Sequence, residues 1–170
     1  MLRNERIFLR TIEPLDIDQL LKWENDPKNW RVSGTTVPFS RHLMEQYIQS
    51  AQDIFIVGQL RFMVCLLNGK TAGAADLFEF EPTHLRAGVG ILIDEPFRKQ
   101  GLAAEALSLL EIYCTEHLRL KNLWCNILEN NIGSATLFEK CGYQLVGVKK
   151  RWFNDGNKWL DEKLYQKELK

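Results

Sequence analysis

Three apolar segments in the centre of the chain constrain its fold most. Residues 60–67 and 71–80 each read as a hydrophobic strand, and the Asn68-Gly69 pair between them is a strong signal for a two-residue hairpin turn. Residues 85–93 indicate a further strand directly after this hairpin. Strands joined by short turns are antiparallel neighbours, so we expect a β-meander in the middle of the sheet.

The meander leads into the longest predicted helix. From Gly101 to about Leu118, apolar residues recur at helical spacing. No repeat, linker or low-complexity segment is present, so we expect residues 1–170 to form one mixed α/β domain. The other expected elements are a strand at 5–11, a helix at 17–25 capped by Asp16 and stopped at Pro27, a loop at 28–39, a helix at 41–52 capped by Ser40, a strand at 122–128, a short helix from Asn131 to Gly142, and a hairpin of 143–148 with 158–166.

The charge balance narrows the classes of partner. The chain has 22 basic and 22 acidic residues among 170, so its formal net charge is zero. It therefore lacks the electrostatic attraction expected of a protein whose main task is to bind nucleic acid or anionic lipid. No stretch approaches the roughly 20 apolar residues of a membrane span, and the amino terminus has no segment typical of a signal peptide. We expect a cytoplasmic protein that binds neither nucleic acid nor membrane.

The four cysteines give no indication of a metal site. Cys65, Cys114, Cys125 and Cys141 lie in apolar contexts, without CxxC spacing and without paired histidines nearby. We expect buried, reduced thiols and no bound metal.

The most informative short segment is the junction between the third central strand and the long helix, which reads FRKQGLAAEAL at 97–107. The first N–H groups of a helix have no partner within it and lie at the positive end of its dipole. Gly101 allows a conformation that a Cβ would forbid, Ala103 is small, and Arg98 and Lys99 add positive charge. These are the requirements of a phosphate or pyrophosphate site, although a plain glycine-containing helix start has the same pattern.

A second fragment, NIGSATLFEKCGY at 131–143, follows the next strand. Together the two fragments resemble the motifs [QR]xxGx[GA] and NxxAxxLYxKxGF of the GNAT family of N-acetyltransferases. The resemblance extends over essentially the whole chain, and it is greatest to the branch of spermidine N-acetyltransferases and ribosomal-protein N-terminal (RimJ/RimL-type) acetyltransferases. The matching residues are Arg98, Gly101 and Ala103 in the first motif and Asn131, Leu137, Lys140 and Gly142 in the second, with Ser134 and Tyr143 as mild substitutions.

The resemblance implies a fold, an activity and a co-substrate. The fold would be α/β of the α+β kind, with a mixed, mostly antiparallel central sheet, splayed central strands and flanking helices, as in acyl-CoA N-acyltransferases. The reaction would be transfer of the acetyl group of acetyl-CoA, by direct attack, to a primary amine of a small, polyamine-like molecule or of a peptide. The alternatives are a non-catalytic acyl-CoA-binding or sensing protein and an N-terminal protein acetyltransferase.

The resemblance also implies a cofactor site. The pyrophosphate would bind the amides of the helix junction, and the pantetheine would lie between the strands at 90–94 and 123–128. Asn131 fits a plain helix N-cap as well as a cofactor contact. The residues expected to bind acetyl-CoA are Ile91, Leu92, Ile93, Arg98, Lys99, Gln100, Gly101, Leu102, Ala103, Asn131, Ser134, Phe138 and Lys140.

Two departures from the family pattern leave the catalytic residue unassigned. Many members have a tyrosine, thought to protonate the leaving thiolate, where this chain has Phe138. Relatives also often have a glutamate on the central strand where this chain has Gly88. Gly88 and Gly90 instead predict a bulge or a close backbone approach. We therefore name no general acid or base.

The acceptor amine is expected between the loop at 24–39 and the segment at 79–84. Carboxylates there would attract a cation, an indole face would stack on it, and a histidine would relay a proton. The segment WRVSGTT at 30–36 lacks the acidic residues of spermidine acetyltransferases, which weakens a polyamine assignment. The candidate substrate residues are Glu24, Trp30, Glu79, Glu81 and His84, and each of them also fits the ordinary role of a solvated or packing residue.

Assembly depends on the terminal hairpin. Its aromatic residues Trp152, Phe153 and Trp159 favour a homodimer or a higher homo-oligomer, with packing on the chain's own sheet as the alternative.

Overall fold

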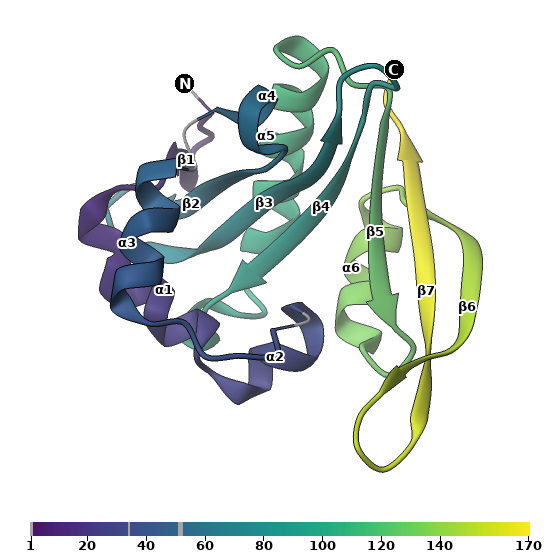
Figure 1. The fold of residues 1–170 in the computed structure, drawn as a ribbon. Coiled ribbons are helices and arrows are strands. Elements are labelled where there is room, and N and C mark those ends of the chain that lie inside the picture. Colours follow the sequence, from purple (N-terminus) through teal and green to yellow (C-terminus); the bar gives the residue numbers. More distant parts are fainter. Residues whose placement is uncertain (1, 34, 51–52) are drawn as a thin grey trace.

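A seven-stranded mixed sheet forms the centre of the protein (Figure 1). The structure is a computed structural model that describes residues 2–33, 35–50 and 53–170. The strand order is β1-β2-β3-β4-β5-β7-β6, and only β4 and β5 are parallel neighbours. This arrangement confirms the predicted mixed, mostly antiparallel sheet. The strands are β1 (Ile7–Thr11), β2 (Leu60–Leu66), β3 (Thr71–Glu81), β4 (Arg86–Ile93), β5 (Asn122–Leu128), β6 (Gln144–Asn154) and β7 (Trp159–Glu168).

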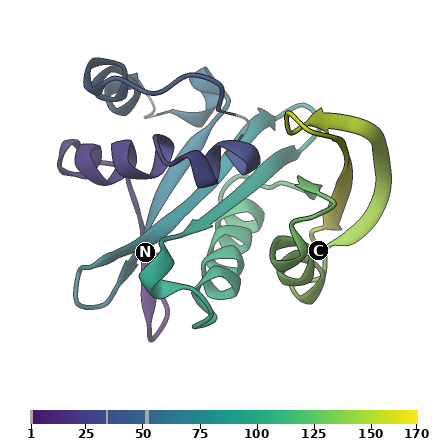
Figure 2. The same ribbon diagram turned by 90° about the horizontal axis from the view of Figure 1, so that it is seen from below.

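Helices cover both faces of this sheet. Figure 2 shows α1 and α3 on one face of β1 to β4 and α5 on the other. No helix in the described residues is long and apolar enough to cross a membrane. The helices are α1 (Ile17–Glu24), α2 (Pro27–Ser33), α3 (Arg41–Ser50), α4 (Ile54–Val57), α5 (Leu102–Glu116) and α6 (Ile132–Lys140), with single 3₁₀ turns η1 (Pro14–Asp16) and η2 (Glu95–Phe97).

Alternation along the strands divides the interior into two cores. On β2, Phe62 and Val64 pack in the core beneath α5, whereas Met63 and Cys65 pack in the core beneath α1 and α3. Successive side chains of a strand point to opposite faces, so one apolar strand supplies both cores. A strand covered on both faces is therefore continuously apolar, as the sequence of β2 is.

The sheet splits at its centre. β4 pairs with β5 only from Arg86 and Asn122 to Gly88 and Trp124, and beyond that point the two strands diverge (Figure 1). The ring of Phe78 fills the apex of the split, because it lies over Gly88 and contacts Trp124 edge to face at 5.2 Å. The predicted bulge or close backbone approach at Gly88 is not what the structure has, because a side-chain ring and not another backbone segment lies over this glycine. Beyond it the splayed central strands lead to the functional cavity.

Most predicted elements are present, and the capping roles of Ser40 and Asn131 are confirmed by bonds from Leu43 N and Ser134 N. The predicted loop at 28–39 is partly wrong, because α2 occupies its first half. Pro27 both stops α1 and begins α2, since proline is well suited to the first helical position. The short helix α4 was not predicted. The predicted end of the second helix, at residues 51 and 52, lies outside the described residues.

Asp16 does not cap α1 with its side chain, contrary to the prediction. Asp16 is 2% exposed. Its carboxylate instead accepts hydrogen bonds from both terminal nitrogens of Arg10, each at 2.7 Å, and from the backbone N–H of Glu13 at 2.9 Å. This bidentate pair fixes the turn that carries the chain from β1 into α1.

The change Asp16→Asn should lower the free energy of unfolding by about 2–4 kcal/mol, because it leaves the Arg10 guanidinium, which is largely buried, without its anion. Urea denaturation measures this. The control is Asp18→Asn, which removes an ion pair between exposed side chains and should cost less than about 1 kcal/mol. Equal losses in the two variants would contradict a structural role for the buried pair.

Candidate functional site

A cavity of about 910 Å³ occupies the split between β4 and β5. Its walls come from β4, β5, the first turns of α5 and α6, the end of α1, and α2. A smaller cavity of about 340 Å³ adjoins it at Trp23, Asn29 and Leu92. The larger cavity passes through the sheet from the face of α5 to the face of α1 and α2, so it has two chemically distinct ends.

At the α5 end, the chain presents free backbone donors. Lys99 and Gly101 have positive φ angles of 61° and 84°, which turn the peptide groups of this segment before the helix begins. None of the N–H groups from Lys99 to Ala103 donates to an acceptor in the described part of the chain. Consecutive free amides at a helix N-terminus form an anion site.

Three side-chain bonds hold this segment in place. Arg6 donates to the carbonyl of Gln100 at 2.9 Å, Gln100 donates to the carbonyl of Pro96 at 3.1 Å, and Arg98 donates to the carbonyl of Ile93 at 2.8 Å. A Cβ on Gly101 would meet nothing closer than Arg6 Nη1 at 3.9 Å, so the space beside the amides is open. The donor segment is therefore both anchored and accessible.

The middle of the cavity is lined by the diverging strand edges. From Val89 onwards, the edge of β4 that faces β5 has no strand partner. Unpaired strand edges carry N–H and C=O groups that bind an extended polar chain readily. On the opposite wall, Phe138 is 2% exposed and packs edge to face on Tyr143 at 4.9 Å. Cys125 also lies here, and burial raises the pKa of its thiol to about 12.

At the other end, an arginine holds two carboxylates. Arg61 Nη1 lies 2.6 Å from Glu24 Oε1, and Arg61 Nε lies 2.5 Å from Asp76 Oδ1. Its guanidinium also lies over the ring of Tyr47 at 5.7 Å. Burial alone would lower the pKa of Arg61, but the attraction of Asp76 and Glu24 outweighs burial and raises it. This end therefore carries a triad of one guanidinium and two carboxylates.

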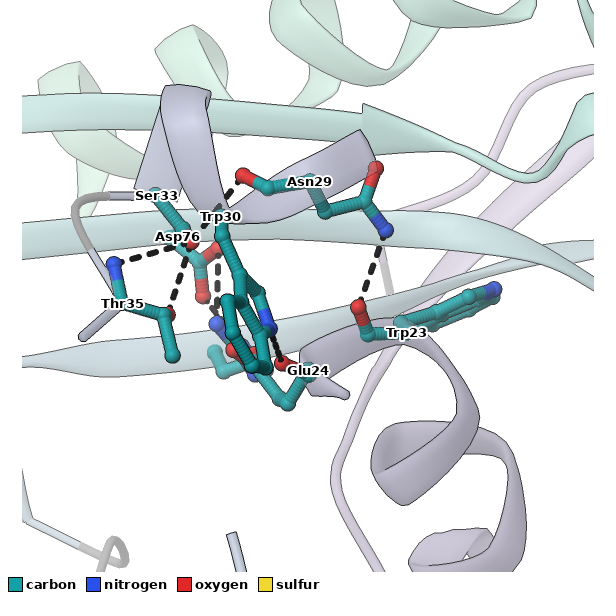
Figure 3. Close-up of polar contacts among 8 residues, drawn as sticks. Trp23, Glu24, Asn29, Trp30, Ser33, Thr35 and Asp76 are labelled. Carbon is teal, nitrogen blue, oxygen red and sulfur yellow. Dashed lines mark hydrogen bonds and ion pairs between the residues drawn. The ribbon is translucent and has the colours of Figure 1, made fainter. Parts of the chain in front are cut away.

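The helix α2 lines the cavity on this side, and Figure 3 shows its Asn29 and Trp30 bonded to the end of α1. Trp30 Nε1 donates to the carbonyl of Glu24 at 2.7 Å, and Asn29 Nδ2 donates to the carbonyl of Trp23 at 2.9 Å. These bonds satisfy the orphan carbonyls at the end of α1 and tie α2 to it. The indole of Trp30 is thus used for structure rather than directed into the cavity.

The cavity brings together most of the predicted cofactor residues and one predicted substrate residue. Gln100 and Lys140 do not line it, and neither does Trp30. Glu79, Glu81 and His84 lie at the opposite end of the β3–β4 hairpin, where β4 and β5 are paired, and Glu81 is bonded to Arg86 at 3.3 Å. The predicted residues that line the cavity are Glu24, Ile91, Leu92, Ile93, Arg98, Lys99, Gly101, Leu102, Ala103, Asn131, Ser134 and Phe138.

The sequence reasoning missed Arg61 and Asp76. They are direct neighbours in the β2–β3 register, and each interrupts an apolar run of its strand. The turn closes with a bond from Leu66 N to Lys70 O. A register shift between Val64 and Cys65 then brings Arg61 opposite Asp76. The predicted two-residue turn therefore did not by itself reveal the pairing. A charged pair inside two apolar strands is the feature that indicates a site there.

Comparison with known proteins identifies the family. Residues 6–144 match the family model of the acetyltransferase (GNAT) domain. The chain is 21% identical to the Bacillus subtilis (strain 168) protein named "Probable N-acetyltransferase YjcK", over 96% of this chain and 94% of that protein.

Solved structures share the fold. A crystal structure of spermidine N-acetyltransferase from Vibrio cholerae in complex with CoA and spermine has a TM-score of 0.90 and 20% identity, over 98% of this chain and 97% of that chain. A dodecameric structure of spermidine N-acetyltransferase from Vibrio cholerae has a TM-score of 0.81 and 21% identity, over 98% of this chain and 95% of that chain. At this identity the likeness establishes the fold.

The apex of the split can be tested by Gly88→Ala. The new Cβ would lie 2.3 Å from the Phe78 ring, so the free energy of unfolding should fall by about 1–3 kcal/mol. In a Phe78→Ala background the same change should cost much less, which a double-mutant cycle in urea would measure. Gly133→Ala, with nothing within 4 Å of the added atom, is the control. An equal cost in both backgrounds would show that the ring is not the obstacle.

Proposed function

Because this chain belongs to the GNAT acetyltransferase family, and therefore uses acetyl-CoA, we propose that it transfers the acetyl group to a primary amine held beside Glu24 and Asp76. The observation that carries the proposal is one continuous cavity that joins free helix amides to a charged triad through the split sheet. This geometry supports placing two reactants in contact, which is the main source of rate for direct attack.

The amides from Lys99 to Ala103 fit the diphosphate of acetyl-CoA. They are unpaired donors at the positive end of α5, the longest helix, and Arg98 and Lys99 add positive charge. In this assignment, the free edge of β4 from Ile91 to Ile93 holds the pantetheine and offers N–H groups to the thioester oxygen. The acetyl group would then face the α1 and α2 end of the cavity.

The amine must lose a proton before it attacks. Glu24 binds the ammonium group, Asp76 and Arg61 hold Glu24 in place, and the proton passes to solvent before attack. Phe138 has no proton to give the leaving thiolate, and Phe78 fills the space at Gly88 where relatives often have a glutamate. A CoA thiolate is a fairly good leaving group, so we assign no general acid from this chain.

A second candidate function is acyl-CoA binding without transfer. Phe138 favours it, because its buried ring replaces the hydroxyl that many relatives have at this position. Both functions share the CoA site, so they differ only in turnover and in the response to Phe138→Tyr.

The CoA site can be tested by Ala103→Glu. A carboxylate among the amides repels the diphosphate, so the Kd for CoA measured by calorimetry should rise about tenfold or more. The matched control is Ser108→Glu, which adds the same charge at an exposed position further along α5 and should leave the Kd unchanged. If both variants bound CoA like the natural sequence, the diphosphate would not lie at this segment.

Transfer can be tested with acetyl-CoA and a panel of primary amines, including spermine and short peptides, with released thiol as the readout. We expect turnover above background with at least one amine. We also expect Phe138→Tyr to leave CoA binding intact, because the ring position is unchanged. Tight CoA binding with no turnover, before and after Phe138→Tyr, would replace the transfer proposal by the binding function.

A further inference from the structure

We propose that the acceptor has one ammonium group, whose nitrogen is the one acetylated, and that it carries a carboxylate or phosphate elsewhere in the molecule. This inference rests on the proposed function and concerns the α1 and α2 end of the same cavity. It assigns Arg61 and Arg31 as residues that determine specificity, and it excludes polyamines as preferred acceptors.

The first argument is that the carboxylates of the cavity are already paired. Within the described residues, the carboxylates that line it are Glu24, Asp76 and Glu162. Arg61 binds the first two, and Glu162 Oε1 lies 2.8 Å from Lys149 Nζ. A polyamine carries more than one positive charge, and an ammonium group that enters a cavity is stabilised most strongly by an unpaired carboxylate. Here a second ammonium group would have to displace a cation of the protein.

Arg61 is a fixed part of the cavity wall rather than a mobile surface cation. Its side chain is 19% exposed, it emerges from the inner strand β2, and it lies over the ring of Tyr47. Glu24 Oε2 accepts no hydrogen bond within the described residues, so the triad retains one oxygen for one ammonium group. The triad thus has a net charge of minus one and suits a single cation.

The second argument is that positive charge at this end is not balanced. Arg31 on α2 is exposed, lines the cavity and forms no ion pair with any described residue. Lys28 reaches only Glu95, at 3.8 Å, and both of these side chains are about three-quarters exposed. An exposed pair of this kind is weak and leaves Lys28 available.

The nearest opposing carboxylate does not satisfy Arg31. Asp155, on the turn between β6 and β7, interacts with Arg31 electrostatically, but it already accepts the backbone N–H groups of Asn157 at 2.9 Å and Lys158 at 2.8 Å. An anionic group on the substrate would therefore find donors on α2 while its ammonium group lies against Glu24. This two-point arrangement distinguishes an amine that carries an anion from a polyamine.

The adjoining smaller cavity offers no better site for a polycation. Asp94 there pairs with Lys22 at 3.3 Å, and Asp26 accepts the backbone N–H of Lys28 at 2.9 Å. Glu95, the remaining carboxylate in its lining, is about three-quarters exposed and lies 3.8 Å from Lys28 Nζ, so it is a surface group rather than part of an enclosed site.

The experiment compares acceptors of one length that differ only at the far end: aminopentanoate, pentylamine and diaminopentane, each acetylated at a terminal amine. Turnover of acetyl-CoA is followed by thiol release. We expect kcat/KM for aminopentanoate to exceed that for pentylamine by about fivefold to tenfold, and the diamine to be poorest. An aminoalkyl phosphate of similar length shows which of the two anionic groups is preferred.

Arg31→Glu should reverse the order of kcat/KM for the two charged acceptors, so that diaminopentane becomes a better acceptor than aminopentanoate. The control Arg119→Glu adds the same charge change at an exposed position in the turn after α5, away from the cavity, and should leave every ratio unchanged. Arg31 is exposed, so its variant should fold, and the circular dichroism spectrum checks this.

The outcomes separate this inference from the proposed function. If pentylamine and the other acceptors all fail to react, the proposed transfer activity fails. If amines react but diaminopentane is preferred, or if Arg31→Glu leaves the ratios unchanged, the charge assignment is overturned while the transferase activity stands.

Discussion

The rest of the structure depends on how short the parallel pairing of β4 with β5 is. This pairing ends at Gly88 and Trp124. Beyond these residues the strands can no longer satisfy each other's backbone groups, and the sheet opens into a cavity. The ring of Phe78 fixes where the opening starts, since it fills the space that any larger residue at position 88 would need. The anion site at α5 and the triad at α1 become parts of one site only because this opening connects them.

The two ends of the site differ in their charged groups: free backbone donors lie at α5, and a guanidinium paired with two carboxylates lies at the end of α1. The free amides at α5 are not opposed by any acidic residue in the lining that the structure describes, whereas Glu24 and Asp76 are held by Arg61. In the proposed function, this arrangement of charges would be a means of rejecting some amines. Specificity would come as much from what the charges repel as from what they attract.

Sequence reasoning was reliable where the signal is local. The Asn68-Gly69 turn, the Asn131 cap and the start of α5 each depend on a few adjacent residues, and the structure contains all three. It failed at α2, since Pro27 is compatible both with the end of one helix and with the start of the next. It missed the Arg61–Asp76 pair because that contact depends on strand register. Glu79, Glu81 and His84, expected near the acceptor from the family resemblance, do not line the cavity and lie at the end of β3 and β4 where the sheet is still paired.

The split also has a consequence for how the molecule holds together. Figure 1 shows that the C-terminal part of the sheet, made of β5, β7 and β6 with α6, joins the rest of the sheet through the short pairing of β4 with β5. In the proposed function, the extended arm of the coenzyme lies along the free edge of β4 and takes the position of a missing strand. The bound coenzyme would then limit the motion of β5 relative to β4. Amide hydrogens on these two strands would exchange with solvent more slowly when the coenzyme is bound.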